Sequence, residues 1–139
     1  MAIFFPLQEE ASKFYAQYLS KIGLEVKLDY IKDNSPNVLA KIPGKTSESS
    51  LMLYGHIDTI PIEKCVEPQI REGKVYGRGS LDMKGSLAVI ALIAKALVKA
   101  RISLENDLWI AVGVAHEAPL GHGEGPRKIA LDIKRGRIK

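Results

Sequence analysis

The first third of the chain changes from a helical to an extended pattern of apolar residues. Between residues 7 and 22 apolar side chains recur every three or four positions, and Gly23 follows where a helix can end. Residues 24–30 alternate between apolar and polar, and residues 37–42 form a second extended segment. The pattern therefore predicts an amphipathic helix followed by two strands.

Two later segments are apolar at nearly every position. Residues 51–55 (LMLYG) and 107–115 (DLWIAVGVA) indicate strands that are apolar on both faces, and we expect the first to be central in a covered sheet. Residues 84–100 predict a helix whose apolar content implies burial on most sides.

The remaining patterned segments predict a small hairpin and a last helix. Residues 71–79 (REGKVYGRG) indicate a hairpin with Glu72 and Gly73 at its turn, and Pro126 can lie in the first turn of a helix that runs to about Lys134. Strands thus alternate with helices, which is typical of an α/β protein. We expect a layered mixed sheet with flanking helices.

Composition places the chain among globular proteins. Its 139 residues are 46 % hydrophobic and 26 % charged, which suits one domain of ordinary size. No apolar run is long enough to cross a membrane, and the opening MAIFF lacks the basic flank of a secretory signal. Cys65 is the single cysteine, which excludes an internal disulfide and fits a reducing compartment, so we expect a cytoplasmic protein.

The net charge of +4 makes nucleic acid a partner to consider. The basic residues are scattered except in KRGRIK at residues 134–139, which could touch phosphates. A solvated, frayed terminus explains the same residues and is the preferred interpretation, and no aromatic residues lie among them for base stacking. We therefore do not expect a nucleic-acid partner.

Side chains that can bind metals follow two of the predicted strands. His56 and Asp58 come at the end of the first apolar strand, and His116 and Glu117 at the end of the last one. Asp82 lies between them in a glycine-rich loop, YGRGSLDMKG. Because ligands of α/β sheets gather beyond the carboxyl ends of the strands, we expect these side chains at one edge of the sheet.

The residue types and their spacing suit a metal centre. His56 and Asp58 point the same way in an extended segment, and a metal-bound imidazole usually needs its other nitrogen anchored by a carboxylate. Zinc accepts imidazole nitrogen and carboxylate oxygen, and Asp82 could bridge two ions roughly 3.5–4 Å apart. A further glutamate could act as general base on water.

Each of these residues also has a purely structural explanation. His56 could be a half-buried residue at a strand end, and Asp58 could cap a turn. Asp82 could be the N-cap of the next helix, and Glu117 could be a solvated loop residue. Taken singly these explanations are preferred, whereas the joint placement on strand ends and in a glycine-rich loop favours a site.

Two ordered motifs give the chain a specific family resemblance. LYGHIDTIP matches G-H-x-D-x-x-P, and VYGRGSLDMKGSLA further along matches G-R-G-x-x-D-x-K-G. The chain resembles the dinuclear-zinc metallopeptidases and amidohydrolases that include acetylornithine deacetylase, succinyl-diaminopimelate desuccinylase, aminoacylase and carboxypeptidase G. The similarity extends from the first helix to about residue 130 and covers only the first part of a family catalytic domain.

The resemblance implies a role for each motif residue. His56 would ligate one zinc ion, Asp58 would orient His56, and Asp82 would bridge two zinc ions, with cobalt as a second suitable metal. The implied reaction is hydrolysis of an amide bond in an N-acyl amino acid or a small peptide. The metals would lower the pKa of water and polarise the carbonyl group.

The third family motif, Asp-Glu-Glu at the end of the next strand, is altered here to AHEAPLGHGEG. Counting from the strand start places the pair of glutamates at His116 and Glu117, which makes Glu117 a ligand. Matching a single glutamate to the base leaves Ala118 in the ligand position. Counting back from the downstream glycines places the pair at Ala118 and Pro119, with Glu117 in the aspartate position. We predict Glu117 as the general base.

The family also supplies a later carboxylate and a late histidine, after an inserted domain that often dimerises. Neither follows here, and His122 is a poor substitute because a short loop separates it from Glu117. We expect residues 1–139 to form one partial, truncated zinc-peptidase-like catalytic domain without the inserted dimerisation domain and the C-terminal catalytic part. An inactive remnant that serves as a binding or interaction module is the alternative, and surface left uncovered predicts self-association.

Overall fold

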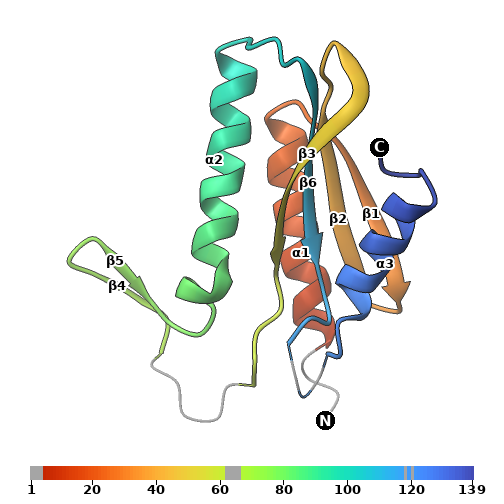
Figure 1. Cartoon of the computed structure of the whole chain (residues 1–139). Helices are drawn as coiled ribbons and strands as arrows, with labels where there is room; N and C mark the ends of the chain where they lie inside the picture. The colour runs from red at the N-terminus through yellow and green to blue at the C-terminus, as the bar shows by residue number, and fades with distance from the viewer. Residues whose placement is uncertain (1–4, 62–66, 118, 120) are drawn as a thin grey trace.

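The computed structural model describes residues 5–61, 67–117, 119 and 121–139. These residues form a mixed sheet with helices on both sides and a small separate hairpin (Figure 1). The predicted α/β class, with a layered mixed sheet and flanking helices, is confirmed. The elements are α1 (Phe5–Lys21), β1 (Glu25–Lys32), β2 (Ser35–Ile42), β3 (Thr46–His56), β4 (Gln69–Arg71), β5 (Lys74–Tyr76), the short η1 (Ser80–Lys84), α2 (Gly85–Lys99), β6 (Asn106–Gly113) and α3 (Glu124–Lys134).

Local turn chemistry sets several element boundaries where the sequence predicts them. The hairpin of β4 and β5 turns at Glu72 and Gly73, whose φ angles are 52° and 73°. Gly23 follows α1 with a φ of 99°, a left-handed conformation that commonly ends helices. Pro126 lies in the first turn of α3, which begins at Glu124. Cys65 lies outside the described residues.

Among the residues that the structure describes, the main sheet has four strands in the order β1-β2-β6-β3. β1 pairs antiparallel with β2, and β2 antiparallel with β6, whereas β3 runs parallel to β6. α2 forms the crossover between β3 and β6, because parallel neighbours cannot be joined by a tight turn (Figure 1). The prediction that residues 107–115 contain a strand covered on both faces agrees with the burial of β6.

β3 is an edge strand, so the prediction that residues 51–55 are central in the sheet is wrong. Its only strand neighbour in the described part of the chain is β6. Leu51 and Tyr54 are 62 % and 37 % exposed. An apolar run shows that a strand can be covered, whereas its place in the sheet depends on pairing with distant strands.

The sheet separates two apolar cores. α1 and α2 lie on one face and α3 on the other (Figure 1). Leu19, Leu87 and Ile110 belong to the larger core, under α1 and α2. Ala111 belongs to the smaller core with Ile129 of α3. Successive β6 residues enter opposite cores because side chains alternate across a strand.

α2 is buried along one side only, which corrects the prediction of burial on most sides. Leu87 and Ala94 lie in the core. Val89, Leu92 and Ile93 are 55 %, 58 % and 43 % exposed, because neither the sheet nor α1 covers their side of the helix. Within the described ranges no helix is long and apolar enough to cross a membrane.

The basic C-terminal segment packs on the sheet, so the prediction of a frayed terminus is wrong. Ile138 is 5 % exposed and lies in the smaller core. Trp109 Nε1 donates a hydrogen bond to the backbone oxygen of Lys139 at 2.7 Å, and Arg137 forms an ion pair with Asp132 at 3.1 Å. The buried Ile138 side chain and these polar contacts therefore anchor the segment, although its charge alone suggests that it is solvated.

Candidate metal centre

Two parallel strands deliver the candidate residues to one edge of the sheet. His56 is the last residue of β3 and pairs in register with Gly113, the last residue of β6. Ile57 then donates a backbone hydrogen bond to the Gly113 oxygen at 3.0 Å. The segments that follow β3 and β6 thus leave the sheet together, at the carboxyl ends of the strands.

His56 is buried, and its two ring nitrogens face different groups. Nδ1 lies 3.0 Å from the backbone oxygen of Asp58, which can only accept, so we assign the hydrogen to Nδ1. Nε2 then carries a lone pair, and it lies 3.2 Å from Asp82 Oδ1 and 3.4 Å from Glu117 Oε1. The two carboxylate oxygens and the Nε2 lone pair repel one another unless a cation or a proton lies between them.

The Asp58 carboxylate ties the segment after β6 to the end of β3. Its Oδ2 accepts hydrogen bonds from the backbone nitrogens of His116 and Glu117, both at 2.8 Å. Its Oδ1 lies 3.7 Å from His56 Nδ1, which is longer than a hydrogen bond. Asp58 therefore holds the His56 ring through its backbone oxygen and holds the neighbouring loop through its side chain.

Asp82 reaches His56 from the loop that precedes α2. It lies in η1 with a φ of −116° and a ψ of 99°, so its backbone is not helical. α2 begins at Gly85 with Lys84 as its N-cap, so Asp82 is not the helix cap that the structural explanation proposed. Its side chain is 77 % exposed, which leaves the carboxylate open to a ligand.

Two glycines allow the elements around the centre to approach closely. A Cβ at Gly55 would lie 2.6 Å from Leu87 Cδ2, so β3 and α2 approach closely here and a side chain at this position would displace Leu87. Gly79 has a φ of 82°, and a Cβ at this position would lie 2.7 Å from Thr59 Cγ2. The glycine-rich motif thus brings the Asp82 loop against the chain that leaves β3.

His116 extends the cluster beyond the predicted residues. Its ring stacks on that of His56, with centroids 4.7 Å apart and an angle of 14° between the planes. Its Nδ1 lies 3.5 Å from the hydroxyl of Tyr54. Partial burial raises the pKa of Tyr54 to about 12, so this hydroxyl keeps its proton at neutral pH. The sequence points to His116 only through its place beside Glu117 at a strand end.

The donor atoms fit a divalent metal such as zinc. Ligand atoms of His56, His116 and Glu117 all lie within 4.8 Å of one another. Tetrahedral zinc with bonds of about 2.0–2.1 Å places its ligand atoms roughly 3.4 Å apart. The separations of 3.2 and 3.4 Å from His56 Nε2 to Asp82 and Glu117 agree with this value. His122 is exposed and is not one of this trio.

Asn37 supports the loop that carries His116 and Glu117, and sequence reasoning gave it no role. Its side chain is fully buried. Its Oδ1 accepts a hydrogen bond from Val114 N at 3.1 Å, and its Nδ2 donates one to the Gly125 oxygen at 3.0 Å. Both ends of the segment between β6 and α3 are therefore fixed by one amide. A polar residue at the start of an apolar strand was the available signal.

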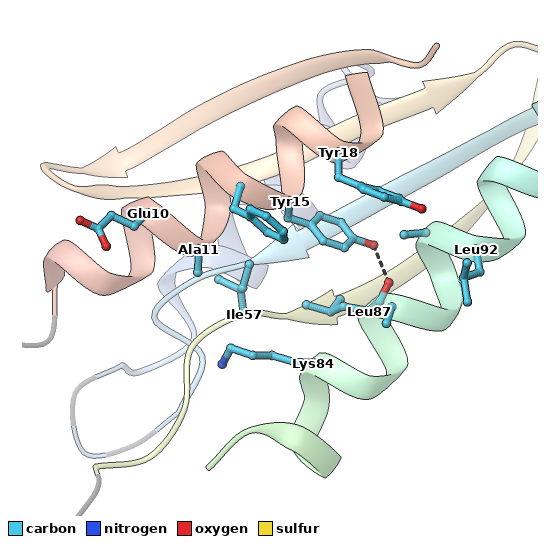
Figure 2. A pocket seen from close by; sticks show the side chains of 11 residues that line it. Glu10, Ala11, Tyr15, Tyr18, Ile57, Lys84, Leu87 and Leu92 are labelled. Carbon is cyan, nitrogen blue, oxygen red and sulfur yellow. Dashed lines mark hydrogen bonds between the residues drawn. The ribbon is translucent and has the colours of Figure 1, made fainter. Parts of the chain in front are cut away.

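A largely apolar groove lies beside the centre, between α1 and α2. It has a volume of about 690 Å³ and includes Ile57, which stands between His56 and Asp58, and Lys84. Figure 2 shows these side chains facing the groove, with the Tyr15 hydroxyl donating a hydrogen bond to the Leu87 backbone oxygen at 2.8 Å. This bond ties α1 to α2 along the groove.

Comparison with known proteins identifies the family. A model described as peptidase family M20/M25/M40 matches residues 52–137. N-formyl-4-amino-5-aminomethyl-2-methylpyrimidine deformylase of Halalkalibacterium halodurans is 35 % identical over 117 residues, which cover 78 % of this chain and 27 % of that protein. Succinyl-diaminopimelate desuccinylase of Corynebacterium glutamicum is 36 % identical over 104 residues, which cover 70 % of this chain and 28 % of that protein.

The solved structures agree on the fold. The Bacillus subtilis YXEP protein, described as a dinuclear metal binding peptidase from the M20 family, gives a TM-score of 0.58 at 19 % identity, over 76 % of this chain and 29 % of that one. The chain spans about a quarter of the length of the curated relatives it matches. Since the family model covers most of the chain, including the segments of both motifs, the chain belongs to peptidase family M20/M25/M40.

Proposed function

We propose that the chain is a partial catalytic domain that supplies one side of the metal centre of an amide hydrolase. The substrate class is N-acyl amino acids or small peptides. The observation that carries this proposal is the position of His56 Nε2, which faces the carboxylates of Asp82 and Glu117 at 3.2 and 3.4 Å. The matched deformylase and desuccinylase, by their names, remove a formyl and a succinyl group, which supports acyl removal as the reaction.

His56 and Asp82 are the residues that would hold the metal, with Asp82 exposed enough to serve two ions. Zinc suits the donor atoms, and cobalt is the second choice. When bound, the metal lowers the pKa of water and polarises the carbonyl group of the substrate. His56 is buried at the strand end, so its position is fixed before a metal or a substrate arrives.

Asp58 and Glu117 would serve the reaction in different ways. Asp58 holds the His56 ring through its backbone oxygen and fixes the Glu117 backbone through its carboxylate. The Glu117 side chain is 24 % exposed, so it can exchange protons with water and substrate. As general base it would take a proton from the attacking water and then give it to the departing amine, which leaves a carboxylate product.

The test combines metal content with hydrolysis. The purified chain is supplied with Zn²⁺ or Co²⁺, its metal content is measured, and release of amine from N-formyl, N-acetyl and N-succinyl amino acids is followed. We expect His56→Ala to lose both metal and turnover, whereas the matched control His122→Ala keeps both. Unchanged metal content and turnover in His56→Ala would contradict the proposal.

Metal binding without turnover is the second candidate, as in a binding or interaction module. It is favoured by the exposed apolar side of α2 and by the altered Asp-Glu-Glu motif, which reads AHEAPLGHGEG here. This candidate predicts no hydrolysis at saturating Zn²⁺. Measurable amide hydrolysis by the purified chain would exclude it.

A further inference from the structure

We infer that His116 is a ligand of the same metal as His56, so that two imidazoles hold one ion at this edge of the sheet. This inference rests on the proposed metal centre and adds a residue to it. Neither the motifs nor the family resemblance assigns His116 this role.

The short distances between the ligand atoms carry the inference. The two imidazoles lie nearly parallel, with 14° between their planes and 4.7 Å between their centroids. Their ligand atoms and that of Glu117 are within 4.8 Å of one another. An imidazole nitrogen binds a metal in the plane of its ring, so the exposed His116 ring would turn out of the stack to direct its nitrogen at the ion that His56 binds.

Hydrogen bonding leaves one nitrogen of each ring available. Nδ1 of His56 is engaged by the Asp58 backbone oxygen, and Nδ1 of His116 faces the Tyr54 hydroxyl at 3.5 Å. Metal-bound histidines commonly donate their second ring hydrogen to an oxygen, which fixes both tautomer and ring orientation. We assign the hydrogen of each ring to Nδ1, which leaves Nε2 as the nitrogen that each ring offers to a metal.

The backbone positions His116 against His56. Asp58 Oδ2 accepts a hydrogen bond from His116 N at 2.8 Å, while the backbone oxygen of Asp58 holds the His56 ring. One residue thus holds both the His56 ring and the backbone of His116. The carboxylates of Asp82 and Glu117 lie beside His56 and supply negative charge that offsets the charge of a divalent ion.

The experiment measures metal binding by the full chain and does not depend on activity. Zn²⁺ affinity is obtained by competition with a chromophoric chelator, and the Co²⁺ form is examined by its visible absorption. We expect His116→Ala to weaken Zn²⁺ binding by at least the roughly tenfold that loss of a residue behind a ligand costs, and to change the Co²⁺ spectrum. His122→Ala, an exposed histidine of the same loop, is expected to behave like the unaltered chain. Circular dichroism melting confirms that each variant is folded.

The outcomes separate this inference from the proposed function. If His56→Ala loses Zn²⁺ while His116→Ala binds it with unchanged affinity and an unchanged Co²⁺ spectrum, His116 is not a ligand and the proposed centre stands. If neither substitution changes the affinity, the proposed centre itself is wrong and the inference falls with it. Tyr54→Phe provides a second measurement. We expect it to lower the Zn²⁺ affinity less than His116→Ala does, because the His116 ring is still present and loses only the hydroxyl that orients it.

Discussion

Asp82 Oδ1 lies 3.2 Å from His56 Nε2, although 26 positions separate the two residues in the chain. The first residue ends an edge strand, and the second lies in the loop before α2. Their meeting joins the two sequence motifs in one place. If this contact is part of a metal centre, its removal must weaken metal binding more than it weakens the fold.

Replacement of Asp82 by asparagine tests that expectation. The substitution removes a charged metal ligand beside His56, so we expect Zn²⁺ affinity to fall by at least the roughly tenfold that loss of a residue behind a ligand costs. The side chain is 77 % exposed, so the free energy of unfolding should stay nearly constant. Asp33→Asn, at an exposed position, is the matched control. Equal Zn²⁺ affinities in the two variants would show that Asp82 does not bind the metal.

Replacement of Asp58 by alanine should affect both stability and the metal centre. It leaves the backbone nitrogens of His116 and Glu117 without their acceptor, and we expect a loss of about 1–3 kcal/mol in the free energy of unfolding. Urea denaturation measures this loss. Asp58→Asn keeps an oxygen acceptor and should lose less. A fully stable Asp58→Ala variant would mean that this carboxylate does not fix the loop.

Glu117→Gln separates a general base from a metal ligand. If Glu117 is the base, Zn²⁺ affinity should remain within about tenfold while hydrolysis of the preferred substrate falls roughly 10²–10⁴-fold. Chelator competition and amine release measure the two effects on one sample. Parallel loss of affinity and turnover would assign Glu117 to the ligand position instead.

The ion pairs of Asp132 predict that the protein loses stability in acid. A hydrogen bond from Lys128 at 2.5 Å, followed by the charges of Lys128 and Arg137, lowers the pKa of Asp132 below its usual 3.8. The folded state then holds the proton less tightly than the unfolded state. The charged Asp132 therefore contributes fully to the free energy of unfolding above a pH of about 4, and this contribution is lost as the pH falls through the lowered pKa.

The corresponding variant is Asp132→Asn. We expect it to lose about 1–2 kcal/mol in the free energy of unfolding at pH 7, and this difference from the unaltered chain should shrink as the pH falls below about 4. Urea denaturation across this pH range provides the measurement, with Asp33→Asn as the control. A difference that stays constant with pH would contradict the role of the charge.

The exposed apolar side of α2 predicts self-association. Val89, Leu92 and Ile93 lie on one side of the helix and are between 43 % and 58 % exposed. We expect the chain to associate at high concentration and Leu92→Glu to reduce the association. Gln69→Glu, an equal change of charge in the separate hairpin, should not reduce it. Sedimentation velocity over a range of concentrations measures the association. An unaltered chain that stays monomeric throughout would contradict the predicted self-association.

The sequence predicted the type of most elements because each carries its own local pattern. The spacing of apolar residues identified α1, α2 and the strands, and glycines such as Gly23 marked where helices end. The sequence did not predict that β3 lies at the edge of the sheet or that one side of α2 is exposed. An apolar strand such as β3 can be central or at an edge, since its neighbours are chosen by segments far away in the chain.

The same division holds for the candidate centre. The sequence by itself determined the residue types, because His56, Asp58 and Asp82 stand in ordered motifs whose chemistry is specific. Only the tertiary structure decided that the His116 ring stacks on His56 and that Asp58 binds the backbone of the loop after β6. These contacts join residues about sixty positions apart, and they exist because β3 and β6 pair in parallel and end at the same edge of the sheet.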